Sequence, residues 1–158
     1  MRTLGNILWH IPLLGFLNAG FAYLSGLLLA ATGVGAPIGL GLMEYGKFLL
    51  APFSRAMISK SELGVEQKKA WKIFSTIIAI FYIITFGIIL SVITLVQAVF
   101  LCFTIFGIPV AVVLAKSLGT IFNPVNKKCV SWAVADELAR EKARKEIEKR
   151  QRRSAKRS

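Results

Sequence analysis

The sequence predicts an all-α membrane protein: two tandem repeats of a broken-helix hairpin, followed by a cytoplasmic C-terminal helix. Residues 3–43 and 73–115 contain no Lys, Arg, Asp or Glu. These stretches of 41 and 43 residues are each about twice as long as the roughly 20 apolar residues of one membrane-spanning helix. Both contain a Gly-x-Pro element, and 55% of the chain is hydrophobic, too much for a fold around a single aqueous core.

The two uncharged stretches belong to an internal duplication. A shift of 72 residues aligns GAPIGLGLMEYGKFLLAP (35–52) with GIPVAVVLAKSLGTIFNP (107–124) without a gap. Apolar sequences share Leu and Ile by chance, so the paired glycines and prolines are the stronger evidence for the duplication. Eight identities fall in this register: Ile11/Ile83, Gly15/Gly87, Leu29/Leu101, Thr32/Thr104, Gly35/Gly107, Pro37/Pro109, Leu42/Leu114 and Pro52/Pro124.

The first segment of each repeat is a long apolar helix with a glycine inside it. Gly15 and Gly87 occupy equivalent positions, and glycine loosens a helix because it lacks a side chain that restricts its backbone. The sequence leaves open whether the helix is kinked or broken there.

Small or short side chains recur every four residues along the first long helix. They predict a face that packs closely against the second repeat or another subunit. The protein is therefore expected to be a homo-oligomer or to have a membrane-protein partner. The positions are Asn18, Ala22, Gly26 and Ala30.

The Gly-x-Pro elements predict helix breaks at Gly35 and Pro37 and at Gly107 and Pro109. Glycine tolerates unusual backbone angles, and proline removes a donor and clashes with the preceding turn. A threonine three residues before each glycine can bond backbone groups that the break frees. The following segment of about 14 residues rises about 21 Å, less than the roughly 30 Å hydrocarbon core. It is either a tilted partial span or a re-entrant or interfacial helix.

Positive charge sets the expected orientation. By the positive-inside rule, the basic loop between the repeats and the basic tail both belong on the cytoplasmic side. Repeat 2 then enters and leaves on that side, repeat 1 does likewise with Arg2 inside, and about four segments are transmembrane or partly re-entrant. The basic residues are Arg55, Lys60, Lys68, Lys69 and Lys72 in the loop, with Lys127 and Lys128 at the start of the tail.

These features divide the chain into four parts. We expect membrane repeat 1 over residues 1–58, a basic cytoplasmic linker over 59–71, membrane repeat 2 over 72–130 and a basic cytoplasmic tail helix over 131–158. Of the net charge of +12, the tail from residue 127 carries +7.

Glu44 and Lys116 occupy equivalent positions in the repeats and carry opposite charges. A charge at the bilayer centre costs about 3 kcal/mol or more, so such residues pair, face water or mark an ion path. One hypothesis joins Glu44 to Lys116, as an ion pair or as a constriction in a polar pathway. A simpler interpretation pairs Glu44 with Lys47 and lets Lys116 reach the headgroups. Together with Gln97, these residues form the candidate intramembrane polar site.

Tryptophans lie at the ends of the apolar runs, where interfacial anchors are common. Trp9, Trp71 and Trp132 occupy these positions. We therefore expect their rings to lie at headgroup level.

The segments GIPVAVVLAKSLGTIFNPVNKKCVS and MEYGKFLLAPF resemble the two repeats of the YccF-type family, bacterial inner-membrane proteins with a duplicated inner membrane component domain. The resemblance covers roughly residues 1–135 and includes the charged residue seven positions after each Gly-x-Pro proline. Ser54 and Asn126 replace a usual glycine, and Ala36 replaces a usual isoleucine. The resemblance implies an inner-membrane location and supplies no catalytic residues.

The tail predicts a solvated helix of about 20 residues with a frayed basic end. Acidic and basic residues alternate at i,i+4 spacing between residues 136 and 152. The basic run 149–156 suits anionic lipid headgroups, at roughly 1 kcal/mol per basic residue. A protein partner is the next interpretation, and nucleic acid is disfavoured because no aromatic residue follows Trp132 to stack on bases.

The sequence predicts that the protein is not an enzyme and binds no cofactor. It has one His, no phosphate-binding loop, no nucleophile motif and no Cys or His residues at metal-ligand spacing. A signal peptide cleaved near Ala31 is disfavoured because cleavage would remove half of a repeat.

The leading hypothesis is therefore a non-catalytic, multi-pass protein of the bacterial inner membrane with a cytoplasmic C-terminus. It would act as an oligomeric structural or accessory component. The alternative is a small channel or transporter with a polar pathway near Glu44 and Lys116, since duplicated units with broken helices are common in transport proteins.

Overall fold

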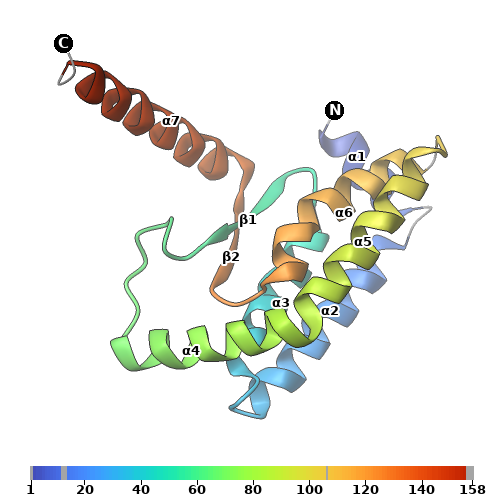
Figure 1. The fold of residues 1–158 in the computed structure, drawn as a ribbon. Helices are drawn as coiled ribbons and strands as arrows, with labels where there is room; N and C mark the ends of the chain where they lie inside the picture. Colours follow the sequence, from blue (N-terminus) through green and yellow to red (C-terminus); the bar gives the residue numbers. More distant parts are fainter. Residues whose placement is uncertain (1, 12–13, 106, 156–158) are drawn as a thin grey trace.

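The computed structural model describes residues 2–11, 14–105 and 107–155, so the last residues of the basic tail, 156–158, lie outside the described residues. Helices form one packed layer, and a long C-terminal helix projects away from it (Figure 1). The elements in order are α1 (Arg2–His10), α2 (Gly15–Ala31), α3 (Ala36–Leu49), β1 (Arg55–Ser59), α4 (Lys69–Tyr82), the π-helix η1 (Ile83–Gly87), α5 (Ile88–Cys102), α6 (Gly107–Phe122), β2 (Lys127–Ser131) and α7 (Trp132–Ala155).

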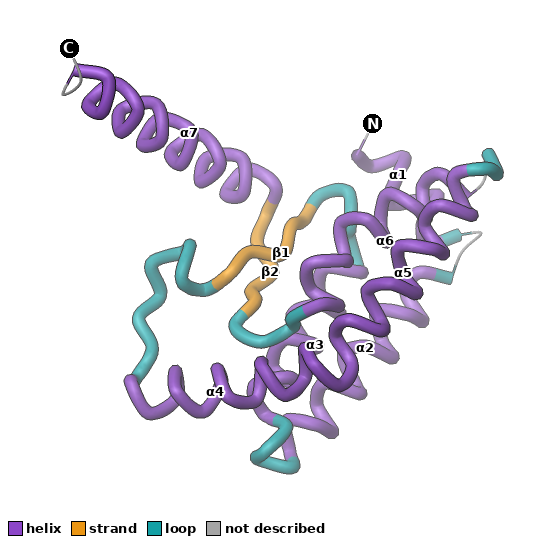
Figure 2. Tube along the Cα trace, in the orientation of Figure 1, coloured by secondary structure: helices purple, strands orange, loops and turns teal. Residues whose placement is uncertain are grey.

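Two short strands correct the prediction of an all-α chain. β1 and β2 pair antiparallel and lie between the helical layer and α7 (Figure 2). Each strand follows the proline that closes its repeat, Pro52 or Pro124, where a helix cannot readily continue. Five residues are too few to show clearly the alternation of apolar and polar residues by which a strand is recognised in a sequence. Each strand also depends on a partner far away in the chain.

The register of the sheet follows the duplication in the sequence. The 72-residue shift carries Arg55–Ser59 onto Lys127–Ser131. In the sheet, Met57 lies opposite Cys129, its own equivalent under that shift, and the outer pairs are arranged symmetrically around it. The sheet therefore has a local two-fold axis at the Met57–Cys129 pair.

The helices contact one another both within and between the two halves. α2 packs against α3, and α5 packs against α6, so each Gly-x-Pro element joins two neighbouring helices. Between the halves, α1 contacts α6 and α4 contacts α3. These two contacts are also equivalent under the 72-residue shift.

Both long apolar segments change direction at the glycine that the sequence singles out. α1 and α2 differ in direction by 80°. At the equivalent place in the second half, η1 interrupts the α-helical pattern, and the chain turns between α4 and α5 (Figure 1). Gly15 and Gly87 are buried at these bends, and a Cβ would meet the Trp9 ring at Gly15 or the Phe122 carbonyl at Gly87.

Two of the four residues of the small-residue face of α2, Gly26 and Ala30, pack against α3 of the same half, a partner that the sequence did not predict. A Cβ on Gly26 would lie 2.7 Å from the Gly39 carbonyl oxygen and 2.7 Å from the Met43 nitrogen. A Cβ on Gly39 would in turn meet the backbone of Ala30. This end of the face is therefore used inside the hairpin, whereas Asn18 and Ala22 line a pocket together with Val113 of the second half.

Threonines satisfy backbone groups at the two breaks. The Thr32 hydroxyl donates to the Leu29 carbonyl at 2.7 Å and accepts from the Gly35 N–H at 3.0 Å. The Thr104 hydroxyl donates to the Leu101 carbonyl at 3.0 Å. In apolar surroundings these bonds replace the water that would otherwise solvate a helix end.

The apolar side chains of the long helices point outward. The helical segment Lys69–Cys102, which comprises α4, η1 and α5, has 34 residues and is long and apolar enough to cross a membrane. Only 11% of its most apolar 18-residue stretch is buried. The bent pair Thr3–His10 and Gly15–Ala31 is also long and apolar enough to cross a membrane when the two helices are taken together. Core helices of soluble proteins bury such residues, so this exposure indicates contact with lipid.

Gly41 provides a test of the packing between the halves. A Cβ at this position would collide with the carbonyl of Pro124, a buried residue of the second half. We expect Gly41→Ala to destabilise the protein by about 1–3 kcal/mol through overpacking, measured as thermal unfolding in detergent. Gly20→Ala is the matched control because no atom outside its own helix lies within 4 Å of the added Cβ. Equal stability of the two variants would contradict this packing.

Candidate functional site: polar contacts between the two halves

Glu44 connects α3 to the second half of the chain. Its Oε1 accepts from Lys47 Nζ at 2.6 Å, which is the ion pair expected from the i,i+3 spacing. Its Oε2 accepts from the backbone N–H of Cys129, on β2, at 2.9 Å. The Glu44 side chain is 19% exposed, so most of it is removed from solvent.

Lys116 makes the corresponding connection from α6 to the first half. Its Nζ donates to the Pro52 carbonyl at 3.0 Å. The ammonium also lies 5.4 Å from the Phe53 ring centroid and 5.1 Å from that of Trp132, distances typical of cation–π contacts. The side chain thus reaches into the first half instead of extending along its own helix to the headgroups, as the simpler interpretation expected.

The opposite charges at these equivalent positions have a physical reason. Each residue binds the main chain of the other half: Glu44 meets an N–H group, and Lys116 meets a carbonyl group. A carboxylate can only accept, and an ammonium can only donate, so each charge matches the group that it faces. The sequence identified both residues, but it could not show these partners, which lie 85 and 64 positions away.

Gln97 takes no part in these contacts. It is exposed on α5, while Thr94, on the same helix, is buried and donates to the Leu90 carbonyl at 2.7 Å. Glu44, Lys47 and Lys116 gather around the sheet, and Gln97 faces the outside of the helical layer. The predicted polar site therefore reduces to the three charged residues.

Side-chain donors at the bends cap the carboxyl ends of the short helices. Trp9 Nε1 donates to the Leu49 carbonyl at 2.9 Å, and His10 Nε2 contacts the Leu50 carbonyl at 2.7 Å. Tyr82, the equivalent of His10, donates to the Ile121 carbonyl at 3.0 Å. These bonds satisfy carbonyls that lack partners at a helix end.

Trp9 therefore does not act as the interfacial anchor that the sequence predicted. It is 4% exposed and packs within the core that includes Phe48 and Val113. Its indole N–H bonds to the end of α3, which explains why a large ring with one polar atom is buried at this bend.

Ser54 and Asn126, where the family pattern has glycine, tie each strand to the first helix of its half. Ser54 accepts from Asn6 Nδ2 at 2.9 Å, and Asn126 Nδ2 donates to the Ser75 hydroxyl at 3.1 Å. Asn126 has φ of 58°, in the left-handed region that glycine and asparagine adopt most easily. Apart from the substitution of glycine, no pattern in the sequence predicts these bonds.

The chemistry available at this site is limited. Burial raises the pKa of the Cys129 thiol, which lowers its reactivity at neutral pH because the thiolate is the nucleophile. Within the described ranges, no group of three or more His, Cys, Asp or Glu residues could hold a metal ion. The contacts of Glu44 and Lys116 join the two halves.

The exposed apolar helices, whose breaks and ends are capped by side-chain hydrogen bonds, define the chain as a helical membrane protein. Residues 4–55 and 77–127 each match the YccF inner membrane component domain. The chain belongs to this family, and it contains the domain twice. Inner-membrane localisation follows from the family. Comparison with curated proteins and with solved structures found no match.

Replacement of Glu44 tests the contact between the halves. We expect Glu44→Ala to destabilise the protein by about 2 kcal/mol, because the Cys129 N–H loses a charged acceptor and Lys47 loses its partner. Glu148→Ala removes a solvent-exposed pair with Arg152, 3.8 Å apart, and should cost less than about 0.5 kcal/mol.

Thermal unfolding measures the loss of stability in both variants, and amide exchange of residues 127–131 locates it. Exchange there should accelerate in Glu44→Ala alone. Unchanged exchange in this strand would show that the carboxylate does not hold it.

Proposed function

We propose that the protein is a non-catalytic structural or accessory component of the inner membrane that holds α7 at the cytoplasmic surface. The observation that carries this proposal is the reciprocal binding of Glu44 and Lys116 to the main chain of opposite halves. Charges used in this way join the protein together and are not free to line a pathway. The alternative of a small channel or transporter is weakened because Gln97, the fourth residue of the predicted polar site, lies apart from these charges.

The proposed topology is two tandem hairpins that share one orientation. The antiparallel pairing of β1 with β2 supports it, because equivalent strands that meet at a two-fold axis lie on the same side of the membrane. The basic residues of β2 and α7 favour the cytoplasm for that side. At 14 and 16 residues, α3 and α6 are about 21 and 24 Å long, shorter than the hydrocarbon core. The four hairpin helices are therefore spanning or partly re-entrant.

The tail helix is attached to the membrane part at several points. The Trp132 N–H donates to the Ser54 carbonyl at 3.0 Å, and the Trp132 ring lies against Lys116. Farther along α7, Lys142 pairs with Glu62 of the linker at 2.9 Å. These contacts set the direction in which α7 leaves the sheet (Figure 1).

The tail also offers a surface for partners. Gly26 and Ala30 of α2 are used against α3, whereas α7 is exposed along most of its length and strongly basic. Anionic headgroups or an acidic face of a membrane-protein partner match this charge. The exposed apolar faces of α2 and α5 remain for contacts between copies of the chain.

Ion flux separates the structural role from the channel. Purified protein in liposomes should leave the vesicles tight to K⁺, Cl⁻ and protons. Glu44→Gln and Lys116→Met should also leave them tight while lowering thermal stability. A flux in the wild type that both substitutions alter would support the channel and contradict the structural role.

Cysteine accessibility tests the shared orientation. In a chain without Cys102 and Cys129, single cysteines replace Val34 or Ile105, which are 66% and 85% exposed at the two hairpin turns. A third variant, Glu141→Cys, marks the tail. We expect a membrane-impermeant maleimide to label the tail from the cytoplasmic side only. It should label the two turns from the same side as each other. Labelling of the two turns from opposite sides would mean that the halves are inverted.

A further inference from the structure

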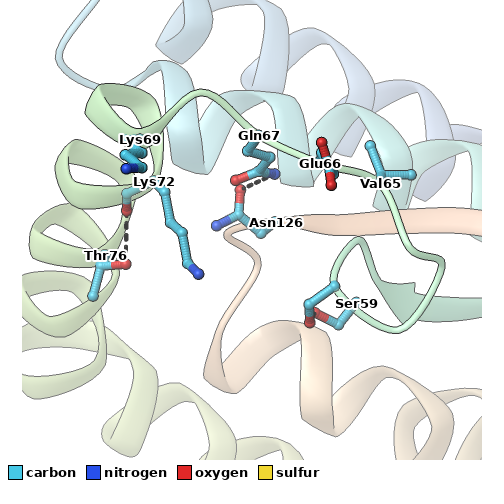
Figure 3. A pocket seen from close by; sticks show the side chains of 9 residues that line it. Ser59, Val65, Glu66, Gln67, Lys69, Lys72, Thr76 and Asn126 are labelled. Atoms are coloured by element: carbon cyan, nitrogen blue, oxygen red, sulfur yellow. Dashed lines mark hydrogen bonds between the residues drawn. The ribbon is translucent and has the colours of Figure 1, made fainter.

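A polar pocket of about 440 Å³ lies beside the start of α4, at the point where the linker and β2 approach that helix (Figure 3). Lys69, Lys72 and Thr76 line it from positions i, i+3 and i+7 of α4, which lie on one helix face. Glu66 and Gln67 line it from the linker, and Asn126 from the turn before β2.

Hydrogen bonds to Asn126 hold the walls of the pocket in place. Its Oδ1 accepts from Gln67 Nε2 at 3.0 Å, and its Nδ2 donates to the Ser75 hydroxyl at 3.1 Å. Its carbonyl also accepts from the Lys60 N–H at 2.8 Å. One side chain therefore joins the linker, α4 and β2, so the pocket is formed without a ligand.

The pocket has an excess of positive charge. In the part of the chain that the structure describes, neither Lys69 nor Lys72 forms an ion pair. Figure 3 shows the Lys72 side chain reaching from α4 into the space beside Asn126. Glu66 contributes the one carboxylate of the lining. Two ammonium groups with several hydroxyl and amide groups suit an anion with several acceptor oxygens, such as a phosphate.

The pocket also lies where a lipid headgroup would be. Lys72 directly precedes the uncharged stretch that begins at Ile73. On α4, Ile73 and Ile77 are 63% and 60% exposed, as expected of side chains that face acyl chains. The acyl chains of a lipid whose phosphate lies in the pocket would thus run along α4 into the hydrocarbon core. A free anion does not need this arrangement.

We propose that this pocket binds the phosphate of an anionic membrane phospholipid. The residues Glu66 and Gln67 that line the pocket belong to the linker between the two repeats. The site fixes one lipid at the junction of linker, α4 and β2, separately from any attraction of headgroups to α7.

Titration of a short-chain phosphatidylglycerol into the full-length protein in maltoside micelles, followed by calorimetry, tests the proposal. Lys69→Gln with Lys72→Gln should weaken binding about 30-fold, since each lysine near the surface contributes about 1 kcal/mol. Lys60→Gln with Lys68→Gln removes the same amount of charge from the neighbouring linker, outside the pocket lining, and should weaken binding less than about threefold. Glu66→Gln should tighten it.

Equal weakening by the two double variants would overturn the proposal, because the attraction would then be spread over the whole basic surface. Unchanged affinity in Lys69→Gln with Lys72→Gln would also overturn it.

Short-chain phosphatidylcholine and free glycerol 3-phosphate identify the ligand. Phosphatidylcholine should bind weakly because its headgroup is neutral overall. Glycerol 3-phosphate bound as tightly as the lipid would overturn the assignment to a membrane lipid.

Discussion

The pairing of β1 with β2 is the interaction on which the rest of the structure depends. It brings equivalent segments of the two halves together at the Met57–Cys129 pair. Around this axis, Glu44 binds β2, and Lys116 binds the residue that closes the first half. α7 continues directly from β2, so its direction is also set by the sheet. A change in strand register would therefore disturb the inter-repeat contacts and the tail together.

A second constraint is that polar main-chain groups in apolar surroundings need partners within the protein. The chain meets this need with few polar side chains. Threonine hydroxyls donate hydrogen bonds to backbone carbonyls at the breaks after α2 and α5. The side chains of Trp9, His10 and Tyr82 cap the carboxyl ends of α3 and α6. These polar side chains thus have a structural use, which agrees with a structural role for the protein.

Much of the local organisation could be predicted from the sequence. The duplication follows from paired glycines and prolines, and the ion pair of Glu44 with Lys47 follows from helical spacing. The breaks at the Gly-x-Pro elements are local too, because Gly and Pro act on the backbone at their own positions.

The remaining features depend on residues that are far apart in the chain. The strands, the Glu44–Cys129 bond and the Lys116–Pro52 bond all join the two halves. A small-residue face shows that another helix approaches closely, yet it does not specify which one, so the packing of Gly26 and Ala30 against α3 could not be predicted. Trp9 was likewise assigned to the interface because its burial depends on α3.

A disulfide across the sheet tests most directly the central claim that β1 and β2 pair with Met57 opposite Cys129. In a chain with Cys102 replaced by serine, Met57→Cys places a cysteine opposite Cys129. Paired residues of antiparallel strands have Cα atoms about 4.5–5.5 Å apart, within the range of a disulfide. Oxidation should form an intramolecular bond in this variant, but not in Ile58→Cys, where the new side chain lies on the other face of the sheet. Failure of Met57→Cys to cross-link, or equal cross-linking of both variants, would contradict the register that joins the two halves.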